Sequence, residues 1–163
     1  MSTASLAGAR AAPSPLTRLL ATPDDAVLLG VRLTLGLVML PHGLQKTLGL
    51  FGGYGFEGTM GFFTGTMGIP WVFALAAILA ESLGALALVL GVCGRVAAFG
   101  IAATMLVAAL TSHVANGFFM DWFGNQGGEG FEYHLLALAL AAVVMVRGSG
   151  RGSIDRWVVG ARG

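Results

Sequence analysis

The chain has 163 residues, of which 56% are hydrophobic and only 10% are charged, and its mean hydropathy is +0.81. Soluble domains carry about 25% charged residues, so this composition indicates an integral membrane protein. The formal net charge is +1 and the basic residues are scattered, which excludes an extended electropositive surface for nucleic acid. Cys93 is the only cysteine, which excludes an internal disulfide and a dithiol motif.

The first 22 residues are rich in Ala, Ser, Pro and Thr and contain no apolar core of the kind that a cleaved signal peptide carries. We interpret residues 1–22 as a flexible cytoplasmic leader, in which residues 14–21 can form a small helix on the membrane surface. Thr22 is expected to cap the first long helix, with Pro23 at its first position and the two following aspartates near the positive end of the helix dipole.

Four segments approach the length of about 20 apolar residues that a membrane-spanning helix needs. They are residues 26–47, 71–92, 95–115 and 131–147. The predicted fold is therefore all-α: an integral membrane four-helix bundle, with a transmembrane domain over residues 23–147. A basic cytoplasmic tail is expected to follow at residues 148–163.

The connections between these segments differ in length. Residues 91–95 are expected to form a tight antiparallel hairpin between the second and third segments. The outer loops at residues 51–70 and 116–130 are rich in glycine and aromatic side chains. We expect both loops at the level of the lipid headgroups, with a short interfacial helix near residues 56–63.

The basic residues predict the orientation of the bundle, because cytoplasmic loops carry an excess of Lys and Arg. Lys46 lies near one side of a four-span topology. The other side carries Arg10, Arg18, Arg95, Arg147, Arg151, Arg156 and Arg162. Both termini and the tight hairpin are thus expected in the cytoplasm.

Two charged residues interrupt the apolar segments. Arg32 shares a helix stripe with Gly36, Gly43 and Lys46, and such a stripe of small residues is expected to face the bundle. Glu81 lies on a similar small-residue face of the second segment. We predict that Arg32 and Glu81 form a buried structural ion pair. A compatible functional hypothesis makes Glu81 a proton carrier or a ligand for a polar headgroup.

A second group of titratable residues is expected at the outer side of the bundle, from His42, Lys46, His113 and Glu132. Groups that converge at one depth can bind or protonate a small molecule, although polar residues also mark the ends of apolar spans. His134 falls on the opposite helix face from Glu132, and we favour Glu132 as the inward residue. No HExxH or paired-cysteine motif accompanies them, so no metal site is predicted.

Several short pieces, in order, resemble the DoxX family of small bacterial membrane proteins. They are Val-Arg-Leu-Thr-Leu-Gly and His-Gly-Leu-Gln-Lys in the first segment, Ala-Glu-Ser-Leu-Gly-Ala-Leu in the second, Gly-Arg-Val-Ala-Ala after it, His113 to Gly117, Phe131-Glu132-Tyr133, and Gly148 to Asp155. The resemblance implies a multi-pass four-helix protein of the bacterial cytoplasmic (inner) membrane. It also implies functional or packing roles for Arg32, Gly36, His42, Gly43, Lys46, Glu81, Gly84, His113 and Glu132.

The leading functional hypothesis is an accessory or quinone-interacting subunit of a membrane-associated oxidoreductase system, since some relatives are described in that way. Glu81, His42, His113 and Glu132 are then the candidates for proton transfer or headgroup binding, and Lys46 is a candidate cofactor-binding residue. No motif in the sequence identifies a cofactor, and quinone is the candidate that the resemblance suggests. Expected partners are the lipid bilayer, redox-enzyme subunits and further copies of the chain. The alternative is a non-enzymatic membrane scaffold or assembly factor.

Overall fold

The computed structural model describes residues 14–160, and all regular elements in this range are helical. The predicted flexibility of residues 1–13, together with Arg10 and Arg162, lies outside the described residues. The elements in chain order are α1 (Pro15–Leu20), α2 (Ala26–Leu48), η1 (Leu50–Gly52), α3 (Gly55–Gly61), η2 (Phe62–Thr66), α4 (Trp71–Leu79), η3 (Ala80–Gly84), α5 (Ala85–Leu90), α6 (Gly94–Ala108), η4 (Ala109–His113), η5 (Val114–Asn116), α7 (Glu132–Arg147) and α8 (Ile154–Gly160).

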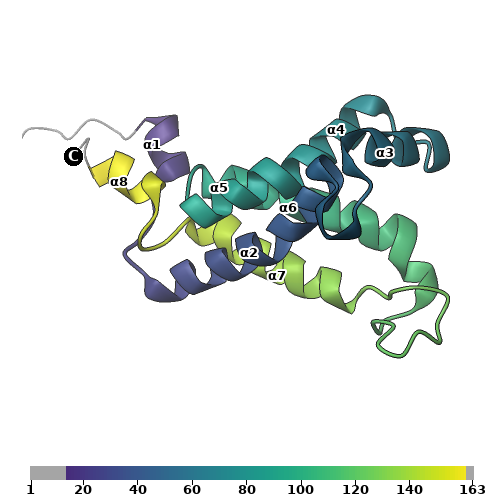
Figure 1. Cartoon of the computed structure of the whole chain (residues 1–163). Coiled ribbons are helices and arrows are strands. Elements are labelled where there is room, and N and C mark those ends of the chain that lie inside the picture. The colour runs from purple at the N-terminus through teal and green to yellow at the C-terminus, as the bar shows by residue number, and fades with distance from the viewer. Residues whose placement is uncertain (1–13, 161–163) are drawn as a thin grey trace, which may run out of the picture.

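Four long helical rods lie alongside one another (Figure 1). Two of them are single helices interrupted by π-helical turns: α4, η3 and α5 form one rod, and α6 continues through η4 into η5. Three rods are long and apolar enough to cross a bilayer: Ala26–Leu48, Trp71–Leu90 and Gly94–Asn116. These bounds agree closely with the predicted segments.

The fourth predicted span forms α7, which has 16 residues and is shorter than expected. At a rise of about 1.5 Å per residue it is about 24 Å long, less than the hydrocarbon thickness of about 30 Å. It nevertheless packs along both α6 and α2 (Figure 1). The structure thus shows an all-helical membrane protein with three candidate spans in the described residues.

The predicted start of α2 is wrong by a few residues. Asp25, rather than Thr22, is the N-cap, and its carboxylate accepts hydrogen bonds from the N–H groups of Val27 and Leu28. Thr22 makes a tertiary contact instead of capping the helix: its hydroxyl accepts a hydrogen bond of 2.6 Å from the N–H of Gly150. The small helix expected near residues 14–21 is present as α1.

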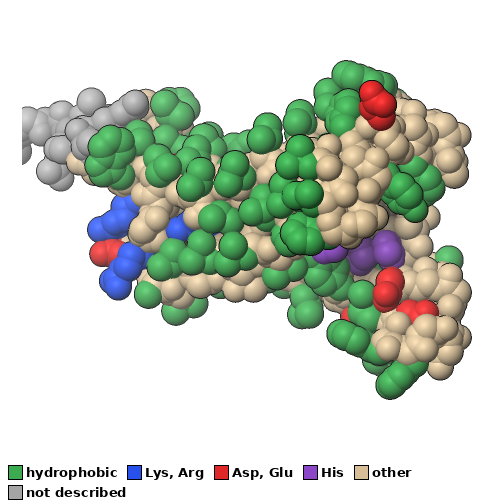
Figure 2. Space-filling model, in the orientation of Figure 1, with side chains coloured by type: hydrophobic (Ala, Val, Ile, Leu, Met, Phe, Trp, Pro, Cys, Tyr) green, Lys and Arg blue, Asp and Glu red, His purple; other side chains and the backbone are tan. Residues whose placement is uncertain are grey.

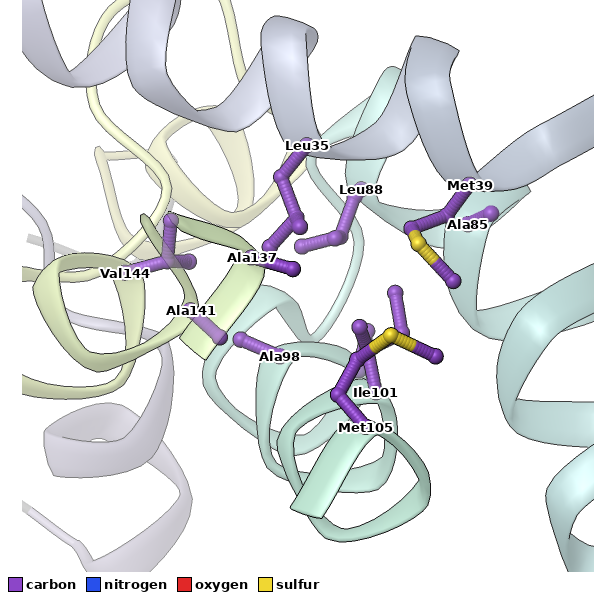
Figure 3. Close-up of a cluster of buried hydrophobic side chains, with 11 residues drawn as sticks. Leu35, Met39, Ala85, Leu88, Ala98, Ile101, Met105, Ala137, Ala141 and Val144 are labelled. Atoms are coloured by element: carbon purple, nitrogen blue, oxygen red, sulfur yellow. The ribbon is translucent and has the colours of Figure 1, made fainter. Parts of the chain in front are cut away.

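The core lies between α2, α5, α6 and α7 and is built from medium-sized and small side chains. Leu35 and Met39 project from α2 toward Leu88, while Ile101 and Val144 close the cluster from α6 and α7 (Figure 3). The expected inward stripe of α2 is confirmed in that Arg32, Gly36 and Gly43 are buried. A Cβ on Gly43 would overlap the backbone of Glu81 and Ser82, so glycine sets the register between α2 and η3.

The hairpin between α5 and α6 is held by the C-terminal segment. Gly91 and Cys93 both have positive φ, which lets the chain reverse within the three residues 91–93. Asp155 of α8 then caps α6: its two carboxylate oxygens accept hydrogen bonds from the N–H groups of Cys93 at 2.7 Å and Gly94 at 3.0 Å. Ser149 donates to the same carboxylate at 2.6 Å.

Basic side chains gather at this end of the molecule, around α8 and the start of α2, while hydrophobic side chains cover the middle (Figure 2). Asp24 forms ion pairs with Arg151 at 2.8 Å and Arg156 at 3.2 Å. The hydrogen bond from Arg151 is the main reason why the pKa of the Asp24 carboxyl lies below its usual value. The histidines lie toward the opposite end, in a hollow between the α3 segment and the loop before α7 (Figure 2).

Candidate functional site

A cavity of about 890 Å³ occupies the end of the bundle opposite the basic residues. Its walls come from α2, η2, α4, α6 and α7, and its surface is mostly apolar. All three π-helical turns contribute to it: Phe62 and Phe63 from η2, Glu81 from η3, and His113 from η4. Such turns re-aim side chains out of the regular helical register and are frequent at functional sites.

Glu81 is paired with Lys46 across the α2–η3 contact. The Nζ of Lys46 lies 2.5 Å from Oε2 of Glu81, and the carboxylate side chain is 4% exposed. Both residues border the cavity. A buried, charge-assisted contact of this kind is strong in a low-dielectric interior, and it leaves further lone pairs and protons free for an occupant.

The predicted Arg32–Glu81 pair is therefore wrong. It rested on counting the rise of each helix from its own end, which placed Arg32 about one helical turn from the depth of Glu81. In the structure, Gly43 of α2 lies against the backbone of Glu81. Arg32 is about 16 Å farther along the helix. Its Nε donates to the carbonyl of Ser149 at 2.8 Å, and its other nitrogens donate to the carbonyls of Leu88, Val89, Arg151 and Gly152.

All three histidines of the chain border the cavity. The rings of His113 and His134 are 4.2 Å apart, and Nδ1 of His113 is 2.8 Å from the carbonyl oxygen of Glu129. His134 is only 6% exposed, and its Nδ1 is the one buried side-chain nitrogen or oxygen in the described residues that has no hydrogen-bond partner. A buried polar atom without a partner costs free energy, which a suitable ligand can recover.

Tyr133 links these histidines to the other half of the site. Its ring centroid is 6.0 Å from that of His42 and 5.7 Å from that of His134, and its hydroxyl donates to the sulfur of Met39. The cavity wall thus carries a continuous arc of polar side chains from the Lys46–Glu81 pair to His113.

Glu132 does not border the cavity, contrary to the prediction. Its carboxylate accepts a hydrogen bond from the N–H of Met120 and so holds the loop before α7. The inward face of α7 instead carries His134, Ala137, Ala141 and Val144. The prediction failed because lipid-facing side chains are as apolar as the core, so apolarity alone does not identify the buried face of a membrane helix.

Comparison with known proteins gives the chain a family. The family model described as DoxX matches residues 27–114, which is more than half of the 163 residues. The chain belongs to the DoxX family. No curated protein and no solved structure matches it. In this DoxX protein the matched segment includes His42, Lys46, Glu81 and His113, and α7 adds Tyr133 and His134 from beyond it.

The donor set of this DoxX site does not resemble a metal centre. Among the described residues, no group of three or more His, Cys, Asp or Glu side chains is arranged to hold a metal ion. The site combines an ion pair, imidazole rings and a phenol around an apolar space, which suits hydrogen bonding and proton transfer to an organic molecule.

Proposed function

We propose that this DoxX protein is an accessory subunit of a membrane oxidoreductase system and that its cavity binds the ring of a lipid-soluble quinone. The observation that carries the proposal is the cavity itself, because an apolar space of about 890 Å³ is bordered by a buried ion pair and all three histidines. Small-molecule sites have this form: apolar walls with a few polar groups that fix orientation.

The polar groups match the chemistry of a quinone ring. Each quinone carbonyl accepts hydrogen bonds, which the Lys46 ammonium and a histidine N–H can donate. Reduction to a quinol consumes two electrons and two protons. In the proposed function a partner subunit supplies the electrons, while Glu81 and the histidines move the protons.

We further propose that α7 crosses the membrane as a fourth span. Its outer end carries Glu132 in the first turn and is preceded by the loop at residues 117–131, and its inner end carries Arg147 and reaches the basic end of the molecule. The exposed basic side chains at that end support a cytoplasmic location for both described ends of the chain, under the positive-inside rule. The expected membrane is the bacterial cytoplasmic membrane.

The test is ligand-induced thermal stabilisation of the purified full-length protein in detergent micelles, with a decyl-tailed benzoquinone as the probe. Saturating ligand stabilises a folded protein by an amount that grows with concentration over Kd. We expect a saturable upward shift in wild type and a reduced shift in Glu81→Gln and His134→Phe, because the first variant removes the ionisable carboxylate and the second removes an imidazole from the cavity.

Asp25→Ala provides the matched control, since it removes the side-chain cap of α2 at the other end of the molecule. It is expected to lower the midpoint without ligand while leaving the ligand-induced shift unchanged. An absent shift in wild type, or equal shifts in all variants, favours the scaffold alternative, in which the buried polar groups serve packing alone.

A further inference from the structure

The rods α4–α5 and α6 diverge from one point toward the cavity end of the bundle. Near their middle they are in close contact, since a Cβ on Gly100 would lie 3.2 Å from the Cβ of Ala80. Toward the other end, η3 and α5 stay packed on α6. Outward from Ala80, α4 has few contacts with α6, so a seam opens between these two helices.

Four residues along this seam line the cavity and are also exposed. Phe73 and Ala76 of α4 and Ala103 and Val107 of α6 all border the cavity. All four are also exposed, with Phe73 65% and Val107 50% exposed. Because exposed residues of two neighbouring helices line the cavity, the space between α4 and α6 is the candidate opening toward the surroundings.

The depth of the opening determines what can pass through it. Ala80 lies about 13 Å along the helix from Trp71, so the seam occupies the outer half of a candidate membrane span. At this depth the surroundings are hydrocarbon rather than water. The seam residues are apolar and mostly small, which suits a flexible hydrocarbon chain and offers no partner to a polar group.

The polar end of an occupant has its partners deeper inside. His134 is buried with an unpartnered Nδ1, and Glu81 is 3% exposed. An occupant that satisfies both regions has a polar ring at one end and a long apolar tail at the other.

We propose that the ligand enters laterally from the bilayer through the seam between α4 and α6 and that, once bound, its ring lies among Lys46, Glu81 and the histidines while its tail remains in the seam. This inference rests on the proposed function. It adds the route by which the ligand enters and the requirement that the ligand carries an apolar tail. The tail contributes to affinity because its methylene groups pack against the seam.

The test compares two benzoquinones with the same ring, one carrying a decyl tail and one without a tail, against protein in lipid nanodiscs. Ala103→Trp and Ala76→Trp each fill the seam from one side. We expect both variants to weaken binding of the tailed ligand by about tenfold or more, equivalent to about 1.4 kcal/mol, and to change binding of the tailless ring by less than about twofold.

Leu106→Trp and Leu79→Trp are the matched controls, because they add the same side chain to exposed positions of the same helices that do not border the cavity. They are expected to bind both ligands like wild type. Unchanged affinity for the tailed ligand in both seam variants overturns the lateral route and leaves the proposed function standing. Failure of both ligands to bind wild type overturns the proposed function and the inference with it. Loss of a copurifying phospholipid from the seam variants, with quinone binding unchanged, assigns the seam to a lipid tail and also overturns the proposal.

Discussion

Arg32 is the most enclosed charged side chain that the structure describes, at 1% exposed. Its positive charge is compensated by hydrogen bonds to backbone carbonyls at the end of α5 and in the C-terminal segment, rather than by an ion pair with a carboxylate. The planar guanidinium can address several oxygens at once, which a lysine ammonium cannot reproduce. The residue therefore joins the first long helix to the last part of the chain.

Replacing Arg32 is expected to destabilise the fold strongly. Arg32→Leu leaves several buried carbonyls without donors and should lower the free energy of unfolding by about 3 kcal/mol. Arg32→Lys should fall between this variant and wild type. Unfolding in micelles with increasing denaturant measures the change. Arg156→Leu, which removes an exposed ion pair with Asp24, should cost less than about 1 kcal/mol, and equal costs for the two leucine variants would contradict this role of Arg32.

Lys46 and Glu81 should behave as a coupled unit. Lys46→Met and Glu81→Gln each strand a partly or fully buried charge, at a cost of about 3 kcal/mol. The double variant removes both charges and should cost about 2 kcal/mol less than the sum of the single variants. A double-mutant cycle of unfolding free energies tests this coupling, and strictly additive costs would show that the pair is not energetically linked.

At the same scale, the sequence predicted which residues lie in the interior or at the cavity better than it predicted their partners. Arg32, Glu81, His42, Lys46 and His113 were all predicted to face the interior or the outer group. Their pairing could not be predicted, because a helical wheel gives the direction of a side chain but not the axial offset between two helices. The axial offset between α2 and η3 depends on which glycine of α2 packs against the backbone of η3, and this glycine is Gly43.

At the scale of elements, the contact between α2 and η3 depends on a single missing side chain. Gly43 and Gly30 occupy the same helix, but an added Cβ at Gly43 would overlap η3 and one at Gly30 would meet nothing within 4 Å. We expect Gly43→Ala to destabilise the protein and Gly30→Ala to stabilise it by up to about 1 kcal/mol through helix propensity. Thermal midpoints of the two purified variants measure this opposite effect, and stabilisation by both would show that the interface can widen freely.

The cap that α8 provides to α6 gives a second prediction. Asp155→Ala removes the acceptors for two backbone N–H groups and for the Ser149 hydroxyl, and should cost about 2 kcal/mol. Hydrogen exchange should accelerate at Cys93 and Gly94 more than at amides in the middle of α6. Uniform acceleration along α6 would instead indicate global destabilisation without a local capping role.

The elements themselves were largely predictable. Apolar length located all four long rods, and the short helix expected near residues 56–63 is present as α3. The π-helical turns were not predicted, because the insertion of one extra residue per turn leaves no distinct pattern of composition. The sequence therefore indicated which side chains to expect in the site, while the turns that aim Glu81 and His113 into the cavity emerged only from the structure.

At the scale of the whole molecule, the unequal distribution of charge predicts a measurable topology. Cys93 is exposed at the basic end and provides a natural reporter. In intact cells it should not react with a membrane-impermeant maleimide, whereas a Cys93→Ser, Phe123→Cys variant should react, since Phe123 is 89% exposed in the loop before α7. Permeabilised cells supply the control in which both cysteines are labelled. Labelling of Cys93 in intact cells would reverse the proposed orientation.

The carbonyl groups that bind Arg32 have a consequence for biosynthesis. Two of the five belong to Leu88 and Val89 at the end of α5, and the other three belong to residues 149, 151 and 152. The guanidinium therefore gains its full set of acceptors only after both segments have been synthesised. Until the second of these segments is present, a charge on the first span has only part of its set of acceptors. We expect a chain truncated before residue 149 to lose three of the five acceptors of Arg32 and to be degraded faster in cells than the full-length chain.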